Sequence, residues 1–340
     1  MFITGTAMAC PVGMSAPSAC AAKRAGVASF EKLPFHDKSG ESVVGSVVPG
    51  FDWALPRQSR LFELLVMALC ELFAAHPNMR WEQVPLLLCL AESAPEAQAD
   101  LYRGLIKRMN DELDVQFDST YSRVVSSGHV SGFIAVEHAR LLIRAGQAPA
   151  CLICGVDSLL DAATLQVLEQ QFRLKTPANR DGLIPGEAAS AVLLQATPSA
   201  HTSTELTGLG FAEEEAPILS GEPLLGRALA SAARLALAET RIGLHEVDLR
   251  LSDVTGELYG FKELALAEAR LMRTVRKREQ PLWHWADAIG DTRAAAGVAQ
   301  LVLVDHAFRH GYAPGSHAIC MTGSVHGGRA VAVVRNCVRQ

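Results

Sequence analysis

The stretch SSGHVSGFIAVEHARLLIRAG, residues 126–146, predicts a tight turn that leads into an amphipathic helix. Apolar residues recur at spacings of three and four from Phe133 onward, and Gly146 follows them as glycine often does just past a helix end. His129 lies where the turn becomes the helix. The free N–H groups and the positive dipole of a helix start favour a thiolate at such a place, so an imidazole there needs an explanation.

Short apolar runs and longer helical segments alternate on both sides of this helix. We expect strands at 2–8, 84–93, 150–158 and 187–196, and helices at 59–76 and 160–172. Strands that are buried on both faces and joined through helices predict a layered α/β protein with a largely parallel central sheet.

The same order of segments restarts near residue 200. A strand at 205–214, a helix at 223–242, a strand at 247–256 and a helix at 292–311 echo the first part, and strands at 317–323 and 329–336 close the chain. We therefore predict an N-terminal half over 1–200 and a C-terminal half over 201–340. The boundary falls in the polar, turn-rich stretch ATPSAHTST, 196–204.

Composition excludes several classes of function. The net charge is -5 at pH 7, which gives no chain-wide attraction to nucleic acid or to an anionic membrane. No run approaches the roughly 18 apolar residues of a membrane span, and the N-terminal residues are interpreted as a strand and turn rather than a signal peptide. Most of the eight cysteines lie in apolar segments, which predicts buried, reduced thiols and a cytoplasmic location.

Four stretches resemble the β-ketoacyl synthases of the thiolase superfamily, in the family's order and spacing. ITGTAMACPVG, 3–13, is similar to the family's opening strand and turn, and NRDGLIPGEAASAVLL, 179–194, follows its RDGF-x-x-GEGAG segment. The stretch 289–311 follows the family's IGHT-x-x-AAG helix, and GSVHGGRAVAVV, 323–334, lies where the family has GFGGTN and its closing strand. The resemblance implies a thiolase-like fold of two pseudo-repeated halves, in an αβαβα layered arrangement with mixed, mainly parallel sheets.

The resemblance also assigns the family's catalytic positions. Its nucleophilic cysteine falls on His129, its first histidine on Asp253 and its second histidine, from IGHT, on Asp291. The lysine that usually accompanies them falls on Ala286. The Cys-His-His triad is therefore absent, and we expect no catalytic residues at these places.

The replacements oppose condensation chemistry. An imidazole cannot form a thioester, and we expect His129 to be neutral because a helix start disfavours imidazolium. Ionised carboxylates at 253 and 291 accept hydrogen bonds and cannot donate to an enolate oxygen. The predicted pocket comprises Ser127, His129, Glu187, Asp253, Asp291 and His326. Glu187 is expected to be paired inside, and the plain structural interpretation is a neutral His129 bonded to Asp253, Asp291 or His326.

Two other chemistries remain open at this point. Ser126 and Ser127 beside His129 suggest a Ser-His-Asp hydrolase, although the sequence has no G-x-S-x-G elbow. One imidazole and two carboxylates, His129, Asp253 and Asp291, also suit a hard divalent ion. We expect neither, and we predict no metal and no cofactor.

The resemblance then implies a binding function. We expect a catalytically inactive synthase-like protein that acts as a partner subunit, either like a chain-length factor in fatty acid or polyketide-type synthesis or like an accessory or adaptor protein for type VI secretion effectors. The alternative is an acyltransferase or acyl-thioester hydrolase with a remodelled site around His129. The expected partners are a second copy or a thiolase-fold homologue, docked on an edge strand at 150–158, and an acyl carrier protein or a secretion effector.

Overall fold

The computed structural model describes residues 1–92, 95–199, 202–276 and 278–337. The helices are α1 Ala16–Arg24, α2 Arg57–Ala75, α3 Pro95–Leu113, α4 Ser131–Arg144, α5 Ala162–Gln170, α6 Arg227–Thr240, α7 Leu258–Leu271, α8 Ala286–Ile289 and α9 Ala296–Arg309. The strands are β1 Phe2–Ala9, β2 Glu31–His36, β3 Ser42–Gly45, β4 Leu86–Leu90, β5 Arg123–Ser126, β6 Ala150–Ser158, β7 Glu187–Gln195, β8 Thr204–Glu213, β9 Leu249–Ser252, β10 Leu282–Trp283, β11 His317–Gly323 and β12 Gly328–Asn336. Short 3-10 turns include Gly128–Val130 before α4 and Arg293–Ala295 before α9.

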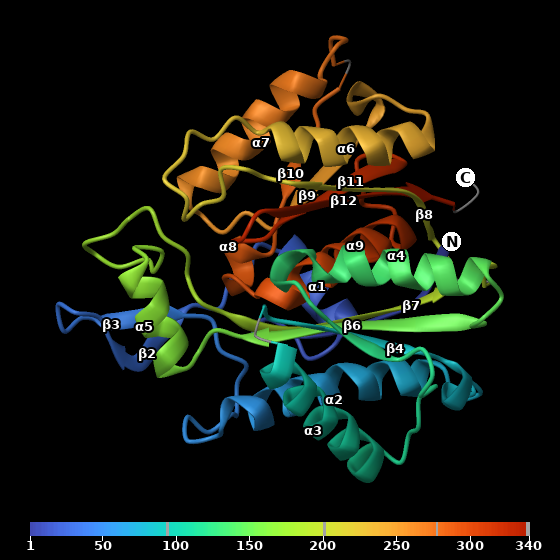
Figure 1. Cartoon of the computed structure of the whole chain (residues 1–340), viewed down its shortest axis with the longest axis horizontal. Coiled ribbons are helices and arrows are strands. Elements are labelled where there is room, and N and C mark those ends of the chain that lie inside the picture. Colours follow the sequence, from blue (N-terminus) through green and yellow to red (C-terminus); the bar gives the residue numbers. More distant parts are fainter. Residues whose placement is uncertain (93–94, 200–201, 277, 338–340) are drawn as a thin grey trace.

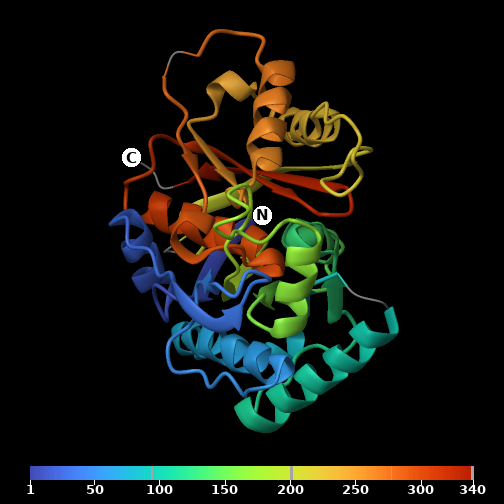
Figure 2. The ribbon, with the colours of Figure 1, turned by 90° about the vertical axis from the view of Figure 1, so that its left-hand side faces the viewer.

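Helices and sheets alternate as layers, and the predicted α/β fold class is confirmed. Figure 1 shows α2 and α3 on one outer face, α6 and α7 on the other, and α1, α4 and α9 between two sheet layers. Figure 2 shows the same stacking from the side. The layers follow from burial: twelve of the fourteen residues of α9 are buried, as expected for a helix covered on all sides.

The strand order of the second half repeats that of the first. The sheet runs β10-β9-β11-β12-β8-β1-β7-β6-β4-β5, so β1-β7-β6-β4-β5 on one side corresponds to β8-β12-β11-β9-β10 on the other. The two parts join where Phe2 and Ile3 pair with Glu205 and Thr204. The predicted boundary at 200 lies outside the described residues and stays a prediction.

The sheet is less parallel than the sequence suggested. The outer strands pair in parallel, as β4 does with β5 and with β6. Around the centre, β7 pairs antiparallel with both β1 and β6, and β12 pairs antiparallel with β8 and β11. The expectation of mainly parallel sheets is therefore wrong. An apolar run that is buried on both faces has the same sequence pattern whether the neighbouring strands are parallel or antiparallel to it.

The position of strand 150–158 also differs from its prediction as an edge. This strand, β6, lies between β7 and β4, and all nine of its residues are buried. The edge of this part of the sheet is β5.

The two cysteines of β6 lie on opposite faces of the strand. Cys151 and Cys154 pack into different hydrophobic cores, as their spacing predicts. Cys70, by contrast, is exposed on α2 and not buried as its apolar neighbours suggested.

The helix at 131–144 ends as the sequence indicates. Gly146 adopts a φ of 67°, Gly146 N donates to Ile143 O and Gln147 N donates to Leu142 O. This pattern closes the last turn as a Schellman motif. No helix of the described residues is both long enough and apolar enough to cross a membrane.

Glycine on β6 permits a close contact with the start of α9. A Cβ on Gly155 would lie 2.5 Å from Ala294 O and 3.0 Å from Ala295 Cα. We predict that Gly155→Ala lowers the free energy of unfolding by about 1–3 kcal/mol, because backbone atoms would have to move. Urea unfolding followed by circular dichroism measures this.

Gly104→Ala is the matched control for this prediction. A Cβ on Gly104 meets only the flexible amide of Gln58, and alanine suits the interior of α3 better by about 0.5–1 kcal/mol. Equal stability of the two variants would contradict the proposed close contact.

Candidate functional site

The turn before α4 holds His129 in a buried position. Gly128 adopts a φ of 56°, and a Cβ there would lie 3.3 Å from the carboxylate of Glu92. Ser131 Oγ accepts a hydrogen bond from Ser127 N at 2.8 Å and donates to Leu90 O at 3.3 Å. These contacts tie the turn to the end of β4 and leave the His129 side chain 6% exposed.

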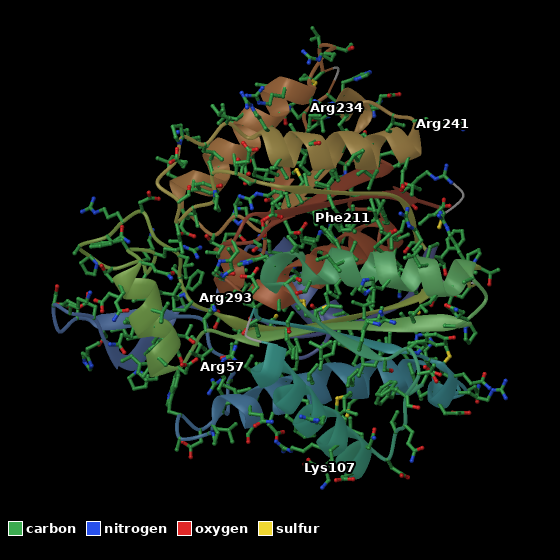
Figure 3. The ribbon with its side chains drawn as sticks, in the orientation of Figure 1. Arg57, Lys107, Phe211, Arg234, Arg241 and Arg293 are labelled. Atoms are coloured by element: carbon green, nitrogen blue, oxygen red, sulfur yellow. The ribbon has the colours of Figure 1, made fainter. Side chains whose placement is uncertain are left out.

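His129 meets Asp291, which comes from the other half of the chain. Nε2 of His129 lies 2.9 Å from Oδ1 of Asp291, and both side chains are buried. Oδ1 of Asp291 also accepts a hydrogen bond from Arg293 N at 2.9 Å. Arg293, labelled in Figure 3, lies beside the central layer of helices. Oδ2 of Asp291 is buried and has no hydrogen-bond partner among the described residues.

The loop that carries Asp291 is held by the segment that resembles the family's RDG motif. Asp291 N donates to Ile184 O at 2.8 Å, and Gly186 N donates to Asp291 O at 3.0 Å. A Cβ on Gly186 would lie 2.0 Å from Ile289 O, so only glycine fits at this crossing. The segment therefore positions the second-half residue that pairs with His129.

The two side chains shift each other's pKa in opposite directions. Burial alone would lower the pKa of His129, but the charge and hydrogen bond of Asp291, with a smaller effect from Asp253, raise it above its ordinary value. Burial alone would raise the pKa of Asp291, but the charge and hydrogen bond of His129, with Arg293, hold it well below its ordinary range. The expected contact of His129 with Asp291 is present. The raised pKa of His129 opposes the expectation of a neutral imidazole, because the effect of the buried carboxylate exceeds that of burial.

Asp253 lies on the wall of a cavity that also reaches His129. Its Oδ2 accepts a hydrogen bond from Gly323 N at 2.8 Å. Burial raises the pKa of Asp253, opposed in part by the charge of His129 and by the Gly323 N–H. The structure therefore brings His129, Asp253 and Asp291 together. This is the arrangement expected if the three residues occupy the positions of the family's catalytic triad.

The cavity is small and its walls carry charges that are already paired. Its volume is about 70 Å³, and His129, Asp253 and Ser324 lie on its wall. Arg173 is bound through two hydrogen bonds of 2.9 and 2.8 Å to Glu257. Arg329 donates to Glu263 at 2.8 Å and to the hydroxyl of Tyr259 at 2.8 Å.

Sequence reasoning missed these two buried ion pairs. Arg173 and Glu257 are 84 residues apart, and Arg329 and Glu263 are 66 residues apart. The only signal available was a charged residue inside an apolar context, such as Arg329 at the start of the strand RAVAVVRN. Such a residue is seldom fully buried unless it is paired.

His326 lies away from the cavity, in contrast to its predicted place in the pocket. Its side chain is 72% exposed, and its Nε2 lies 3.0 Å from Oε2 of Glu92. Ser324 Oγ donates to Oε1 of the same carboxylate and accepts from His326 N at 3.0 Å. The hairpin turn between β11 and β12 directs Ser324 into the cavity and the imidazole of His326 out of it.

Glu187 and Ser127 are also outside the cavity wall. Glu187 is fully buried and accepts hydrogen bonds from Arg60, from Ser158 Oγ at 2.8 Å and from Val48 N at 2.9 Å. The expected internal pairing of Glu187 is present, but at a separate place in the core. Ser127 contributes its backbone N–H to Ser131, and no hydrogen bond joins its hydroxyl to His129 within the described residues.

The other chemistries considered from the sequence find little support in this geometry. A hydrolase would need a serine hydroxyl bonded to His129, whose Nε2 instead faces Asp291. No group of three or more His, Cys, Asp or Glu side chains among the described residues is arranged to hold a metal ion. No cysteine among them lines the cavity.

Comparison with known proteins agrees with this geometry. Residues 120–200 match the family described as beta-ketoacyl synthase, N-terminal domain. The chain is 26% identical over 246 residues to 6-methylsalicylic acid synthase of Aspergillus niger, a match that covers 66% of this chain and 14% of that protein. Part of this chain is thus similar to the β-ketoacyl synthases. It therefore spans about one seventh of the length of this fungal relative.

Solved ketosynthases share the fold of this chain. The oxazolomycin ketosynthase domain of Streptomyces albus JA3453 superposes with a TM-score of 0.79 at 17% identity, covering 100% of this chain and 75% of that one. The ishigamide ketosynthase/chain length factor superposes with a TM-score of 0.72 at 21% identity, covering 98% of this chain and 99% of that one.

The His129–Asp291 pair makes a specific prediction. Asp291→Asn should lower the free energy of unfolding by about 3 kcal/mol near pH 6, because it leaves a buried imidazole without its counter-charge. In this variant the largest cause that raises the pKa of His129 is removed while burial still lowers it, so this pKa should fall. Urea unfolding and NMR titration of the imidazole measure the two effects.

The pH dependence has a defined sign. Because the pKa of His129 is raised in the folded protein, its contribution to the free energy of unfolding is complete below about pH 6.5. That contribution is lost as the pH rises through the raised pKa. Because the pKa of Asp291 is lowered, its contribution to the free energy of unfolding is complete above about pH 4 and is lost only in stronger acid.

Asp287→Asn is the matched control for Asp291→Asn, because it removes an exposed carboxylate that is paired with Lys23. It should lower the free energy of unfolding by less than about 1 kcal/mol. Equal losses in the two variants would contradict the buried pair.

Proposed function

We propose that this chain is a non-catalytic binding partner of a ketosynthase-type protein. The observation that carries the proposal is the buried ion pair between His129 and Asp291, at the two positions that resemble the family's nucleophile and one of its histidines. The alternative is an acyltransferase or acyl-thioester hydrolase with a remodelled site.

The state of His129 opposes covalent chemistry. Burial lowers the pKa of His129, but the charge and hydrogen bond of Asp291 raise it above its ordinary value, and the Nε2 atom is already engaged by the Asp291 carboxylate. Nucleophilic catalysis needs a group activated by a neighbouring base or by a lowered pKa. A thioester intermediate needs a thiol, and among the described residues no cysteine lies on the cavity wall.

The cavity also suits a long acyl chain poorly. Its volume of about 70 Å³ is less than half of the roughly 150 Å³ that holds a benzene ring in an engineered apolar cavity. Its walls carry Asp253, Arg173 and Arg329 rather than a continuous apolar lining. An extended acyl group would remove water from these charged groups, and this costs free energy.

A partner role has a precedent among proteins with this fold. The ishigamide neighbour is described as a ketosynthase/chain length factor, that is, a synthase together with a second subunit. We infer that this chain fills the place of such a second subunit, beside a copy of itself or an active homologue. An accessory role for type VI secretion effectors is the second form of the binding proposal, and the genes beside this one would distinguish the two.

The state of the cysteines supports an intracellular setting for this role. All eight are free, and those at 10, 20, 89, 151, 154 and 320 are buried. Free thiols in apolar surroundings are typical of a reducing compartment. We propose the cytoplasm, with no cofactor required.

Intact mass spectrometry tests the absence of chemistry. After incubation with acetyl-CoA, malonyl-CoA or acyl carrier protein thioesters, the wild-type chain should show no covalent adduct and release no CO2. The matched variant His129→Cys places a thiol at the helix start. Iodoacetamide should alkylate this new thiol faster than it alkylates the exposed thiol of Cys70. A wild-type adduct that disappears in His129→Ala or Ser127→Ala would establish the enzyme alternative instead.

The edge strand β5 is the proposed contact with the partner. Among the described residues β5 pairs only with β4, so its other side has unpaired backbone groups. We expect a dimer by light scattering, with backbone amides at 123–126 exchanging more slowly in the complex than in the dissociated chain. The other edge, β10, is the internal control. Slower exchange at 282–283 alone would contradict a contact through β5.

A further inference from the structure

A pair of histidines lies at the end of α9, outside the site described above. His306 and His310 are one helical turn apart, and His310 N donates to His306 O at 3.0 Å. Their ring centroids are 4.2 Å apart with an interplanar angle of 38°. His306 is half-buried and His310 is exposed, so the pair opens to solvent on one side.

Tyr312 orients the first of these imidazoles. Its hydroxyl lies 2.9 Å from Nδ1 of His306. The Tyr312 ring stacks on Trp283 at a centroid distance of 6.0 Å, and the Arg24 guanidinium lies 4.6 Å from the ring centroid. With Nδ1 bonded to the hydroxyl, Nε2 of His306 is left as the ligand atom. Metal-binding histidines characteristically hold their second ring nitrogen in such a hydrogen bond.

We propose that His306 and His310 bind a divalent transition metal ion of the class that prefers imidazole, such as Ni²⁺, Zn²⁺ or Cu²⁺. Two imidazoles that share an ion, each with its nitrogen about 2 Å from the metal, have ring centroids roughly 4.5–5 Å apart. The observed centroid separation of 4.2 Å is close to this range. Water fills the remaining coordination positions, because no third His, Cys, Asp or Glu ligand is grouped with the pair among the described residues.

The electrostatic setting favours binding of moderate strength. The C-terminal end of α9 presents the negative end of its dipole, which favours a cation. Arg309 is already paired with Asp305 at 2.7 Å, which offsets its charge. Arg24 lies against the ring of Tyr312 and keeps some positive charge close to the site. Under the usual order of metal affinities, Cu²⁺ should bind most strongly of the three.

Calorimetric titration of the full chain, made without a histidine tag, tests the site. Ni²⁺ is the first probe because it interferes least with thiols, and we expect about one ion per chain at pH 7.5. His306→Ala and His310→Ala should each weaken binding at least about tenfold, and Tyr312→Phe should weaken it about tenfold while leaving one site. Circular dichroism confirms that each variant is folded.

Two matched variants separate this site from other ligands. His36→Ala removes a single exposed histidine elsewhere, and Cys70→Ser removes the exposed thiol, so both should bind as the wild type does. Binding weaker than roughly 1 mM in the wild type would overturn the proposal. Binding that survives both His306→Ala and His310→Ala, or that is lost in Cys70→Ser, would overturn it as well.

Discussion

The close packing of α4 against α9 is the constraint on which the rest of the structure depends. A Cβ on Gly132 would lie 3.0 Å from Val298 Cγ2 and 3.1 Å from Val298 N, so the backbones approach as nearly as glycine allows. This contact places the starts of two buried helices, one from each half, beside each other. His129 and Asp291 meet there because neither helix can begin elsewhere without losing this packing.

Most charges of the site formed at that junction are paired within the protein. His129 lies against Asp291, and the guanidinium groups of Arg173 and Arg329 are each matched by a glutamate. Asp253, on the cavity wall, accepts a hydrogen bond from Gly323 N. The pairs that His129 and Arg173 form join residues of the two halves and stabilise the junction between them.

A further buried ion pair holds the first half together at a distance from this junction. Arg60 and Glu187 lie on α2 and β7, and Ser158 on β6 and the backbone at Val48 complete the bonds of the carboxylate. The neighbouring residues at 184–186 bind the loop at 290–291. The stretch 179–194 therefore serves the architecture of both halves, which explains why it can resemble the family's motif while the catalytic positions differ.

Local pattern alone determined the helices and strands on either side of His129 and the repeat of their order, since periodicity lies within the chain. The resemblance to the β-ketoacyl synthases, and not the local pattern, implied that His129, Asp253 and Asp291 meet. Only the tertiary structure decided that β6 is an inner strand, that His326 points outward and that Arg173 and Arg329 are buried with Glu257 and Glu263. The physical reason is range, because strand direction, edge position and ion pairing depend on residues tens of positions away. The carboxylate of Asp291, 162 residues from His129 in the sequence, likewise raises the pKa of that imidazole.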